Sequence, residues 1–412
     1  MKKTYTEITK CRISDSENLT TVLSLGNMDL TGVFPKSKDE KVTNGPVDLV
    51  WCPDSGLLQM KQTYNLEEMY GDNYGYRSGL NSSMVSHLKQ KIKTLENIVK
   101  LNDSDLVIDI GSNDATSLKS YKGNHRKVGI DPTGSKFKEF YTDDITLIAD
   151  FFTADKFRKL FPNEKAKIIT SIAMFYDLES PLDFVSDIAS CLDDEGIWHF
   201  EQSYMPSMLK TNSYDTICHE HLEFYSLKVV KKMLEKSGLR IMDVQMNSIN
   251  GGSFAVTACK EKASHSSNEP IINWLLNQED EMGLDTPKPY NEFAERAFKH
   301  KKNLVDLIDA LVKDGKKVFG YGASTKGNVL LQFCNLTSKQ IPYIAEVNEE
   351  KFGSYTPGSH IPIISENEAK AMSPDYFLVL PWHFKNNILA REKEFLANGG
   401  KFIFPLPEIE II

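Results

Sequence analysis

Residues 105–111 read Asp105-Leu106-Val107-Ile108-Asp109-Ile110-Gly111, a short apolar run that ends in an acidic residue and a glycine. A short run of mostly apolar residues bounded by polar ones predicts a strand buried on both faces, as in a parallel sheet. The glycine predicts a tight turn where the backbone can approach a ligand. We therefore expect an α/β domain built around this strand.

Similar runs recur along the chain on both sides of residues 105–111. Helical spacing of apolar residues over 84–101 precedes the strand, and helical segments separate most of the strands that follow, which is typical of a doubly wound sheet. These further strands are predicted at 127–130, 145–148, 166–170, 196–200, 240–244 and 253–257.

The remaining sequence predicts two flanking units, and so an α/β protein of three domains. Residues 1–75 alternate short β-type runs, at 20–25 and 47–51, with turn-forming residues, which predicts a small β-rich N-terminal module. Residues 76–262 form the central doubly wound domain, and residues 263–412 a Rossmann-like α/β domain. The C-terminal unit follows a charged helical stretch over 268–314, and its strands are predicted at 317–322, 341–345, 376–380 and 401–404.

The composition limits partners and location. The 412 residues are 41% hydrophobic and 25% charged, with a formal net charge of -9. An acidic chain without a basic stripe is not expected to bind nucleic acid. No apolar stretch reaches the roughly 18 residues of a membrane span, and residues 1–9 lack the apolar core of a signal peptide. We expect a cytoplasmic protein without a membrane partner and with its six scattered cysteines reduced; the oligomeric state is left open.

Three predicted strand ends carry residues suited to a nucleoside ligand. The turn Gly111-Ser112-Asn113-Asp114-Ala115 lacks the second glycine of a dinucleotide fingerprint, which favours S-adenosylmethionine over a nicotinamide cofactor. Asp131 ends the next strand, where a carboxylate can accept hydrogen bonds from ribose hydroxyls, and Asp150 with Phe151 could hold adenine. The predicted cofactor-binding residues are Asp109, Gly111, Asn113, Asp131, Asp150 and Phe151.

The run Tyr214-Asp215-Thr216-Ile217-Cys218-His219-Glu220-His221-Leu222-Glu223-Phe224-Tyr225-Ser226 resembles that of the sugar C-methyltransferases, which make branched deoxysugars for antibiotics and bacterial surface polysaccharides. The motifs at 250–253, 320–327 and 356–362 match the same family in the same order. The resemblance therefore covers essentially the whole chain.

The resemblance implies an N-terminal zinc-binding module, a central S-adenosylmethionine domain and a C-terminal Rossmann-like domain, with a nucleotide-linked sugar between the last two. The family binds zinc with two C-x-x-C pairs, but the second cysteine of each pair is here Ser14 or Ser55. Serine is a poor zinc ligand, and structural sites need four good ones. We therefore expect no metal, with only Cys11 and Cys52 left should a zinc site survive.

The resemblance also implies a reaction. Methylation of an unactivated sugar carbon needs a carbanion equivalent, so the expected substrate is a nucleotide-linked 4-keto-6-deoxy sugar deprotonated at C3 to an enediolate. The family's base falls on His221, with Glu220 orienting it or the sugar. Cys218 replaces the tyrosine of better-known relatives, and Tyr74 or Tyr76 matches an aromatic pair that reaches the site.

Residues 320–326 end a strand and open a helix, a turn whose N–H groups can bind a diphosphate with Lys326 as counter-charge. The predicted substrate-binding residues are Asn250, Tyr321, Ser324, Lys326, Glu346 and His383. Three alternatives remain from the residues alone: an O- or N-methyltransferase of the same sugars, a nicotinamide-dependent oxidoreductase using the Gly320–Gly322 turn, and a non-catalytic carbohydrate-binding scaffold.

Overall fold

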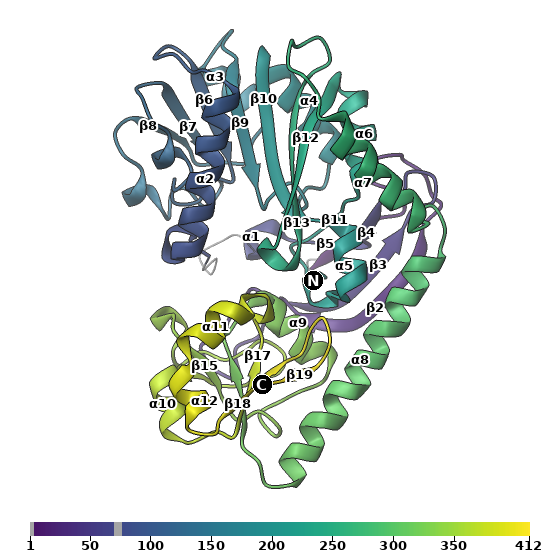
Figure 1. Cartoon of the computed structure of the whole chain (residues 1–412), viewed down its shortest axis with the longest axis vertical. Helices are drawn as coiled ribbons and strands as arrows, with labels where there is room; N and C mark the ends of the chain where they lie inside the picture. Colours follow the sequence, from purple (N-terminus) through teal and green to yellow (C-terminus); the bar gives the residue numbers. More distant parts are fainter. Residues whose placement is uncertain (1–3, 70–75) are drawn as a thin grey trace.

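The computed structural model describes residues 4–69 and 76–412. Its N-terminal part is an antiparallel sheet of β2 (Thr20–Asp29), β3 (Asn44–Trp51) and β4 (Leu58–Met60). Beside it, β1 (Tyr5–Glu7) pairs with β5 (Gln62–Tyr64), and α1 (Leu66–Met69) follows. Figure 1 shows these strands in purple between the central sheet above and the C-terminal sheet below.

The central sheet has seven strands in the order β12-β13-β10-β9-β6-β7-β8. All run parallel except β13, which is antiparallel to both of its neighbours. The expected α/β sheet is confirmed, but the reversed strand was not predicted. The bounds are β6 (Leu106–Ile110), β7 (Arg126–Ile130), β8 (Ile145–Ile148), β9 (Ala166–Ile172), β10 (Leu192–Ser203), β12 (Leu239–Asn247) and β13 (Ser253–Lys260).

Helices cover both faces of this sheet because alternate strand residues point to opposite sides. Val107 of β6 packs in one core with Leu95 of α2, whereas Ile108 packs in a second core with Ile188 of α4. The loops between β6 and β7 and between β7 and β8 contain the 3-10 turns η2 (Leu118–Ser120) and η3 (Lys138–Phe140). The helices are α2 (Ser82–Ile98, after η1, Ser78–Leu80), α3 (Ala154–Leu160), α4 (Pro181–Cys191), α5 (Met205–Thr211) and α6 (Leu227–Lys236).

The charged helical stretch forms two helices rather than one, α7 (Glu269–Glu281) and α8 (Lys288–Lys313). The break follows from Gly283, whose φ of 67° is left-handed, and from Pro287, which precedes the second helix. Glu279 of α7 is buried and accepts hydrogen bonds from the N–H groups of Leu227 and Lys228 at the start of α6. This cap fastens the connecting helices to the central domain.

The C-terminal sheet has the order β16-β15-β14-β17-β18-β19 and is parallel except for β19. Its strands are β14 (Val318–Tyr321), β15 (Ile344–Glu346), β16 (Ile363–Ser365), β17 (Tyr376–Val379), β18 (Lys401–Phe404) and β19 (Glu410–Ile411). Its helices are α9 (Thr325–Phe333), α10 (Glu366–Ala371), α11 (Lys385–Arg391) and α12 (Lys393–Ala397), with turns η6 (Glu349–Lys351) and η7 (Trp382–Phe384).

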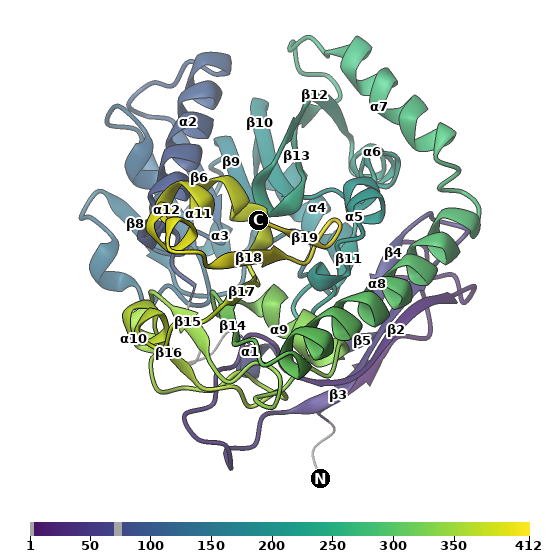
Figure 2. The same ribbon diagram turned by 60° about the horizontal axis from the view of Figure 1, so that its bottom comes forward.

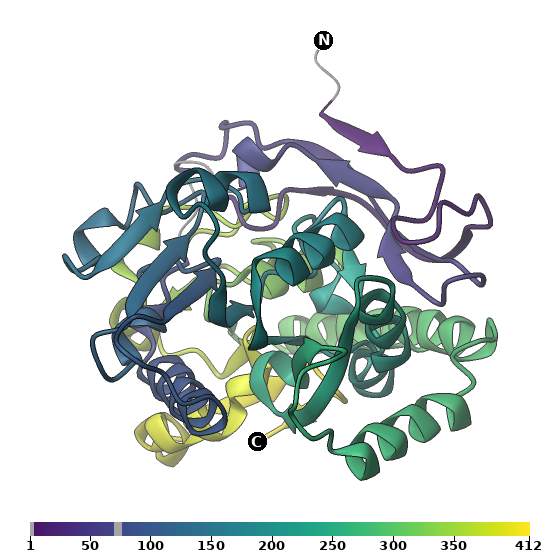
Figure 3. The ribbon, with the colours of Figure 1, turned by 90° about the horizontal axis from the view of Figure 1, so that it is seen from above.

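One hydrophobic cluster joins the three parts, apart from the two cores that cover the faces of the central sheet. Trp51 of β3 stacks on Tyr290 of α8 with ring centroids 4.9 Å apart, and side chains of the N-terminal sheet, α5, α8 and the C-terminal sheet belong to the same cluster. Figure 2 shows α8 lying along β2, and Figure 3 shows the N-terminal strands along one side of the molecule. Among the described helices, none is both long and apolar enough to cross a membrane.

Candidate active site

The segment with the His-Glu-His triplet lies where all three parts meet. It begins with η4 (Tyr214–Thr216), which contacts α9 of the C-terminal domain. It ends with β11 (Glu223–Phe224), which joins the N-terminal sheet beside β4. Between them, the N–H groups of Leu222 and Glu223 donate to the carbonyl of Tyr176, in the loop after β9, at 2.8 and 3.0 Å. Each domain therefore helps to hold the segment in place.

One ring nitrogen of His221 is fixed by a hydrogen bond, and the other keeps its basic lone pair. Its Nδ1 lies 2.7 Å from the carbonyl oxygen of Thr216. Because a carbonyl only accepts, Nδ1 carries the hydrogen and Nε2 carries the basic lone pair. Burial, and then the ammonium of Lys326, lower the pKa of His221 to about 4. The ring is therefore uncharged near neutral pH, and its edge contacts the ring of Tyr176 at 4.4 Å between centroids.

Charged groups from two domains gather beside His221. Lys326, on the first turn of α9, has its pKa lowered by burial, and the carboxyl of Asp215 partly opposes that shift. Burial raises the pKa of Asp215, whose Oδ2 accepts a 2.7 Å hydrogen bond from Nε1 of Trp382. Burial and Lys326 also lower the pKa of His383 to about 3. The cluster thus places one ammonium among a carboxyl group and two neutral imidazoles.

The other residues of the triplet region face the N-terminal module. His219 is fully buried with its ring 4.6 Å from that of Tyr64, and burial lowers its pKa to about 4. Cys218 is 1% exposed, and burial with the neighbouring Glu220 raises its pKa well above the ordinary value, so it remains a thiol. Burial also raises the pKa of Glu220. These surroundings favour a packing role for Cys218 and His219.

The turn that the sequence predicts to bind the cofactor follows β6, at the carboxyl end of the parallel strands. Gly111 has φ of 72° and Asn113 φ of 49°. The Asp131 carboxylate accepts hydrogen bonds from the N–H of Asn113 at 2.8 Å and from the N–H of Thr133 at 2.7 Å. Asp109 instead accepts from the hydroxyl of Thr170 at 2.6 Å, and burial raises its pKa to about 7. Asp109 thus links β6 to β9 next to the turn.

The segment after residue 75 is attached to the same turn. Asn113 donates from its side chain to the carbonyl of Tyr76 and accepts from the N–H of Ser78 at 3.1 and 3.0 Å, and Asp114 accepts from the N–H of Gly79 at 2.9 Å. The side chain of Tyr76 is 51% exposed beside the turn, whereas Tyr74 lies outside the described residues.

The third predicted strand end lies on the surface. Asp150 pairs with Lys156 at 2.8 Å and accepts from the N–H of Phe151 at 2.7 Å. Phe151 is 43% exposed, so its ring is accessible to a ligand. The structure therefore brings Asn113 and Asp131 together with Tyr76, and leaves Asp150 and Phe151 at the open rim.

The turn after β14 is fixed largely by its own residues. Ser324 caps α9 by accepting from the N–H of Gly327 at 3.0 Å. Glu346 accepts from the N–H groups of Ala323 and Asn348 at 2.7 and 2.9 Å. These hydrogen bonds fix the turn that leads into α9, the helix that contacts η4.

Two further predicted substrate residues take different positions. The hydroxyl of Tyr321 donates to the buried carboxylate of Glu392 at 2.9 Å, and the exposed side chain of Arg391 donates to the same hydroxyl. Asn250 lies in η5 (Ile249–Gly251), where a Cβ added to Gly251 would lie 3.2 Å from the ring of Trp382. Lys326 thus acts electrostatically on both His221 and His383, whereas the hydroxyl of Tyr321 is bonded elsewhere. Sequence reasoning missed Asp215 and Tyr176, although Asp215 lies within the run that carried the resemblance.

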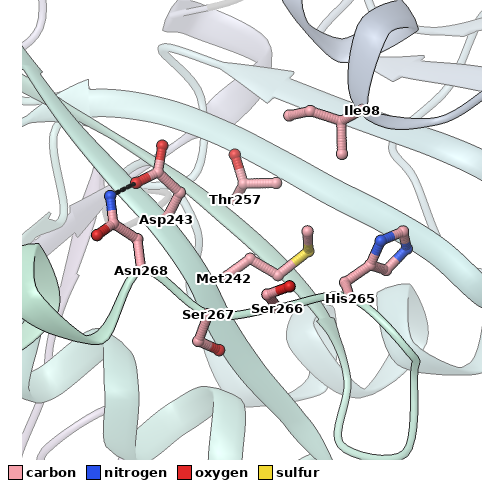
Figure 4. Close-up of a pocket in the computed structure, with 8 residues that line it drawn as sticks. All are labelled: Ile98, Met242, Asp243, Thr257, His265, Ser266, Ser267 and Asn268. Atoms are coloured by element: carbon pink, nitrogen blue, oxygen red, sulfur yellow. Dashed lines mark hydrogen bonds between the residues drawn. The ribbon is translucent and has the colours of Figure 1, made fainter.

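A pocket of about 400 Å³ lies elsewhere, beside β12 and β13. Figure 4 shows Asp243, Thr257 and His265 around it, with Asn268 donating to Asp243 at 2.9 Å. None of the predicted site residues lines this pocket. The pocket therefore lies apart from the segment that carries His221.

Comparisons with known proteins agree with this architecture. A model described as the C-methyltransferase C-terminal domain matches residues 248–407, a methyltransferase domain model matches residues 84–244, and a zinc binding domain model matches residues 11–70. The chain belongs to the C-methyltransferase family. It is 31% identical over 409 residues to the C-methyltransferase NovU of Streptomyces niveus, covering 98% of this chain and 97% of that protein.

Solved structures resemble the chain only in part. Magnesium protoporphyrin IX methyltransferase from Synechocystis is 16% identical, with a TM-score of 0.34 over 46% of this chain and 90% of that one. The mitomycin 7-O-methyltransferase MmcR is 15% identical, with a TM-score of 0.34 over 44% and 55%. Family membership shows that the protein is a C-methyltransferase, so an O- or N-methyltransferase, an oxidoreductase and a non-catalytic scaffold are set aside.

The zinc implied by the N-terminal family model does not fit this chain's residues. The four expected ligand positions do come together, with Cys11 Sγ 3.2 Å from Ser55 Oγ and Ser14 Oγ 3.7 Å from Cys52 Sγ. Two thiols and two hydroxyls are a poor donor set for zinc. Within 4–69 and 76–412, no group of three or more His, Cys, Asp or Glu side chains is arranged to hold a metal ion. We derive no role for zinc.

Proposed function

We propose that this C-methyltransferase transfers a methyl group from S-adenosylmethionine to C3 of a nucleotide-linked 4-keto-6-deoxy sugar, with His221 as the base. The observation that carries the proposal is the 2.7 Å contact between His221 Nδ1 and Thr216, which leaves a neutral imidazole with Nε2 basic. A proton on a carbon next to a carbonyl is far more acidic than one on an unactivated carbon, and its removal leaves an enediolate whose charge must be stabilised.

Lys326 supports this step electrostatically. An ammonium close to His221 disfavours the imidazolium in the free enzyme and lowers its pKa. Once the enediolate forms, its negative charge offsets that repulsion and is itself stabilised by the ammonium. The base is therefore neutral before the reaction and better able to keep the proton after it. Glu220 is proposed to orient the sugar.

The cofactor is proposed to bind at the edge of the central sheet. S-adenosylmethionine supplies an electrophilic methyl group. The turn at Gly111 and Asn113 and the carboxylate of Asp131 would hold its amino acid and ribose parts, since both oxygens of that carboxylate already face N–H donors of these loops and retain capacity to accept. Asp150 and the exposed ring of Phe151 would border the adenine, and Tyr76 lies beside the turn.

The nucleotide-linked sugar is proposed to lie between the central and C-terminal domains. The N-terminus of α9, with Ser324 and Lys326, would face its diphosphate. His383 and Asn250 lie on η7 and η5, which contact each other across the two domains. Glu346 would act through the turn with which it is hydrogen-bonded, and Tyr321 lies at the end of the strand that leads into this turn. In this proposal residues 1–75, 76–262 and 263–412 form the module, the cofactor domain and the sugar-nucleotide domain of a branched-deoxysugar enzyme.

Product mass tests the proposal most simply. Purified protein is incubated with S-adenosylmethionine and dTDP-, GDP- or CDP-linked 4-keto-6-deoxy sugars, and products are examined by mass spectrometry and NMR. A methyl carbon bonded to C3 with one of these nucleotides is expected. A methyl group on oxygen, or no product with any of the three nucleotides, would contradict it.

A further inference from the structure

A short segment of the N-terminal module, residues 29–32, lies against the candidate active site, and we name it the module loop. Helix α9 holds its backbone at two points. Gln332 accepts from the N–H of Asp29 at 2.8 Å and donates to its carbonyl at 3.1 Å. Asn328, one turn earlier on the helix, donates to the carbonyl of Thr31 at 2.8 Å. The module loop is thus fixed to the helix whose first turn carries Lys326.

Gly32, the last residue of the module loop, lies against the segment with the His-Glu-His triplet. A Cβ added to Gly32 would lie 2.4 Å from Oε1 of Glu220, and 3.8 Å from Oγ1 of Thr325 at the start of α9. Real Cβ atoms do not approach an oxygen this closely, so a side chain at this position and the present position of the carboxylate exclude each other.

The need for glycine here is one of space rather than of backbone conformation. Gly32 lies outside the left-handed region that favours glycine, so alanine can adopt its backbone angles. Thr31 and Asn328 are fully buried and joined by a hydrogen bond, so the loop cannot readily retreat. The Glu220 side chain is therefore the part that must move if a Cβ is added.

From these contacts we infer that Gly32 is a positioning residue of the active site: its missing side chain sets where the Glu220 carboxylate stands. The N-terminal module then forms one wall of the site. This inference rests on the proposed role of Glu220. It assigns to the module a function that needs no metal.

A double-mutant cycle tests the inference. Gly32→Ala is expected to lower kcat by about 100-fold, the cost of misplacing a catalytic group by roughly 1 Å. Its KM for the nucleotide sugar should stay within about twofold, because the proposed nucleotide contacts lie on other elements. Glu220→Asp shortens the carboxylate by one methylene and makes room, so adding Gly32→Ala to it should cost nothing further. Ser37→Ala, at an exposed position of the same module, is the control and should match the wild type.

Two outcomes would overturn the inference. One is a folded Gly32→Ala enzyme with kcat within about threefold of the wild type. The other is a double variant reduced relative to Glu220→Asp by the same factor as Gly32→Ala alone, because additivity means that the two residues do not interact. If Gly32→Ala alone does not fold, the comparison of Glu220→Asp with the double variant still decides.

The inference and the proposed function fail in different ways. A wild-type enzyme that methylates C3 while Gly32→Ala is unimpaired refutes the inference only. A wild-type enzyme that methylates no 4-keto sugar refutes the proposed function, and crystal structures of the wild type and Gly32→Ala then decide the steric claim. They are expected to show the Glu220 carboxylate displaced, and an unmoved carboxylate would overturn it.

Discussion

Nε1 of Trp382 donates a 2.7 Å hydrogen bond to Oδ2 of Asp215, and so joins the C-terminal domain to the segment that carries His221. Both residues are buried. Trp382→Phe keeps most of the ring but leaves the Asp215 carboxyl without this donor. We expect the free energy of unfolding to fall by about 1–3 kcal/mol in a urea titration. Trp274→Phe, at a 54% exposed position on α7, should change it by less than about 0.5 kcal/mol; equal effects would show that the bond is not important.

The lowered pKa of His221 predicts an unusual acid limit for activity. A histidine with its ordinary pKa of 6.5 would lose its basic form through that pH, whereas the pKa of His221 lies at about 4. The acid limb of kcat/KM, which reports groups of the free enzyme, should therefore lie well below pH 6.5. Lys326→Met removes the ammonium that depresses this pKa, so the limb should move to higher pH. A limb that stays or moves lower would contradict the assigned interaction.

Three buried histidines with lowered pKa values make the stability of the fold depend on pH. His219, His221 and His383 stay neutral in the folded chain down to a pH of about 4 or 3. In the unfolded chain each binds a proton near pH 6.5. Their contribution to stability is thus complete above that pH and is lost as the pH falls from about 6.5 toward 4. Thermal midpoints measured over this range should follow that course.

Asp131 is predicted to control cofactor affinity. Asp131→Asn replaces one accepting oxygen with a donor that faces the N–H groups of the turn, so S-adenosylmethionine should bind at least about tenfold more weakly by calorimetry. Asp144→Asn is the matched control. This exposed aspartate comes just before β8 and pairs with Lys127, so it lies at the amino ends of the strands, away from the turn that Asp131 contacts. Equal cofactor affinity in wild type and Asp131→Asn would place the ribose elsewhere.

The Cys–Ser cluster of the N-terminal module can be tested by gain of function. With only two thiolate donors, the wild-type chain should purify without stoichiometric zinc, as measured by plasma mass spectrometry. Ser14→Cys together with Ser55→Cys restores four sulfur donors at positions that already lie together, and this variant should bind about one zinc per chain. Zinc retained by the wild type, or absent from the double variant, would contradict this account.

Much of the fold was predictable because burial leaves a mark on the sequence. The apolar runs at β6, β7 and β9 predicted strands, since parallel strands are covered on both faces. The reversal of β13 and the three-residue strand β16 were not predicted, because strand direction and short pairings depend on contacts remote in sequence. The break between α7 and α8 has a local signal in Gly283 and Pro287. The helical spacing of the whole stretch nevertheless predicted one continuous helical segment.

The candidate site was less predictable than the fold. The family resemblance indicated His221, and the position of Asp131 at the end of a predicted strand indicated a ribose contact. The contacts of Gly32 with Glu220 and of Trp382 with Asp215 join distant parts of the chain, and residue type gives no sign of them. Residue type likewise gives no sign that the hydroxyl of Tyr321, predicted to contact substrate from its place in a glycine turn, is bonded to Glu392.

Solvent exchange at C3 tests the central claim most directly. The 4-keto sugar nucleotide accepted by the enzyme is incubated in D₂O with S-adenosylhomocysteine in place of the methyl donor, and loss of the C3 proton signal is followed by NMR for wild type and His221→Asn. The account predicts exchange by the wild type and a rate at least about 100-fold slower for the variant. Exchange by His221→Asn at the wild-type rate would show that another group takes the proton.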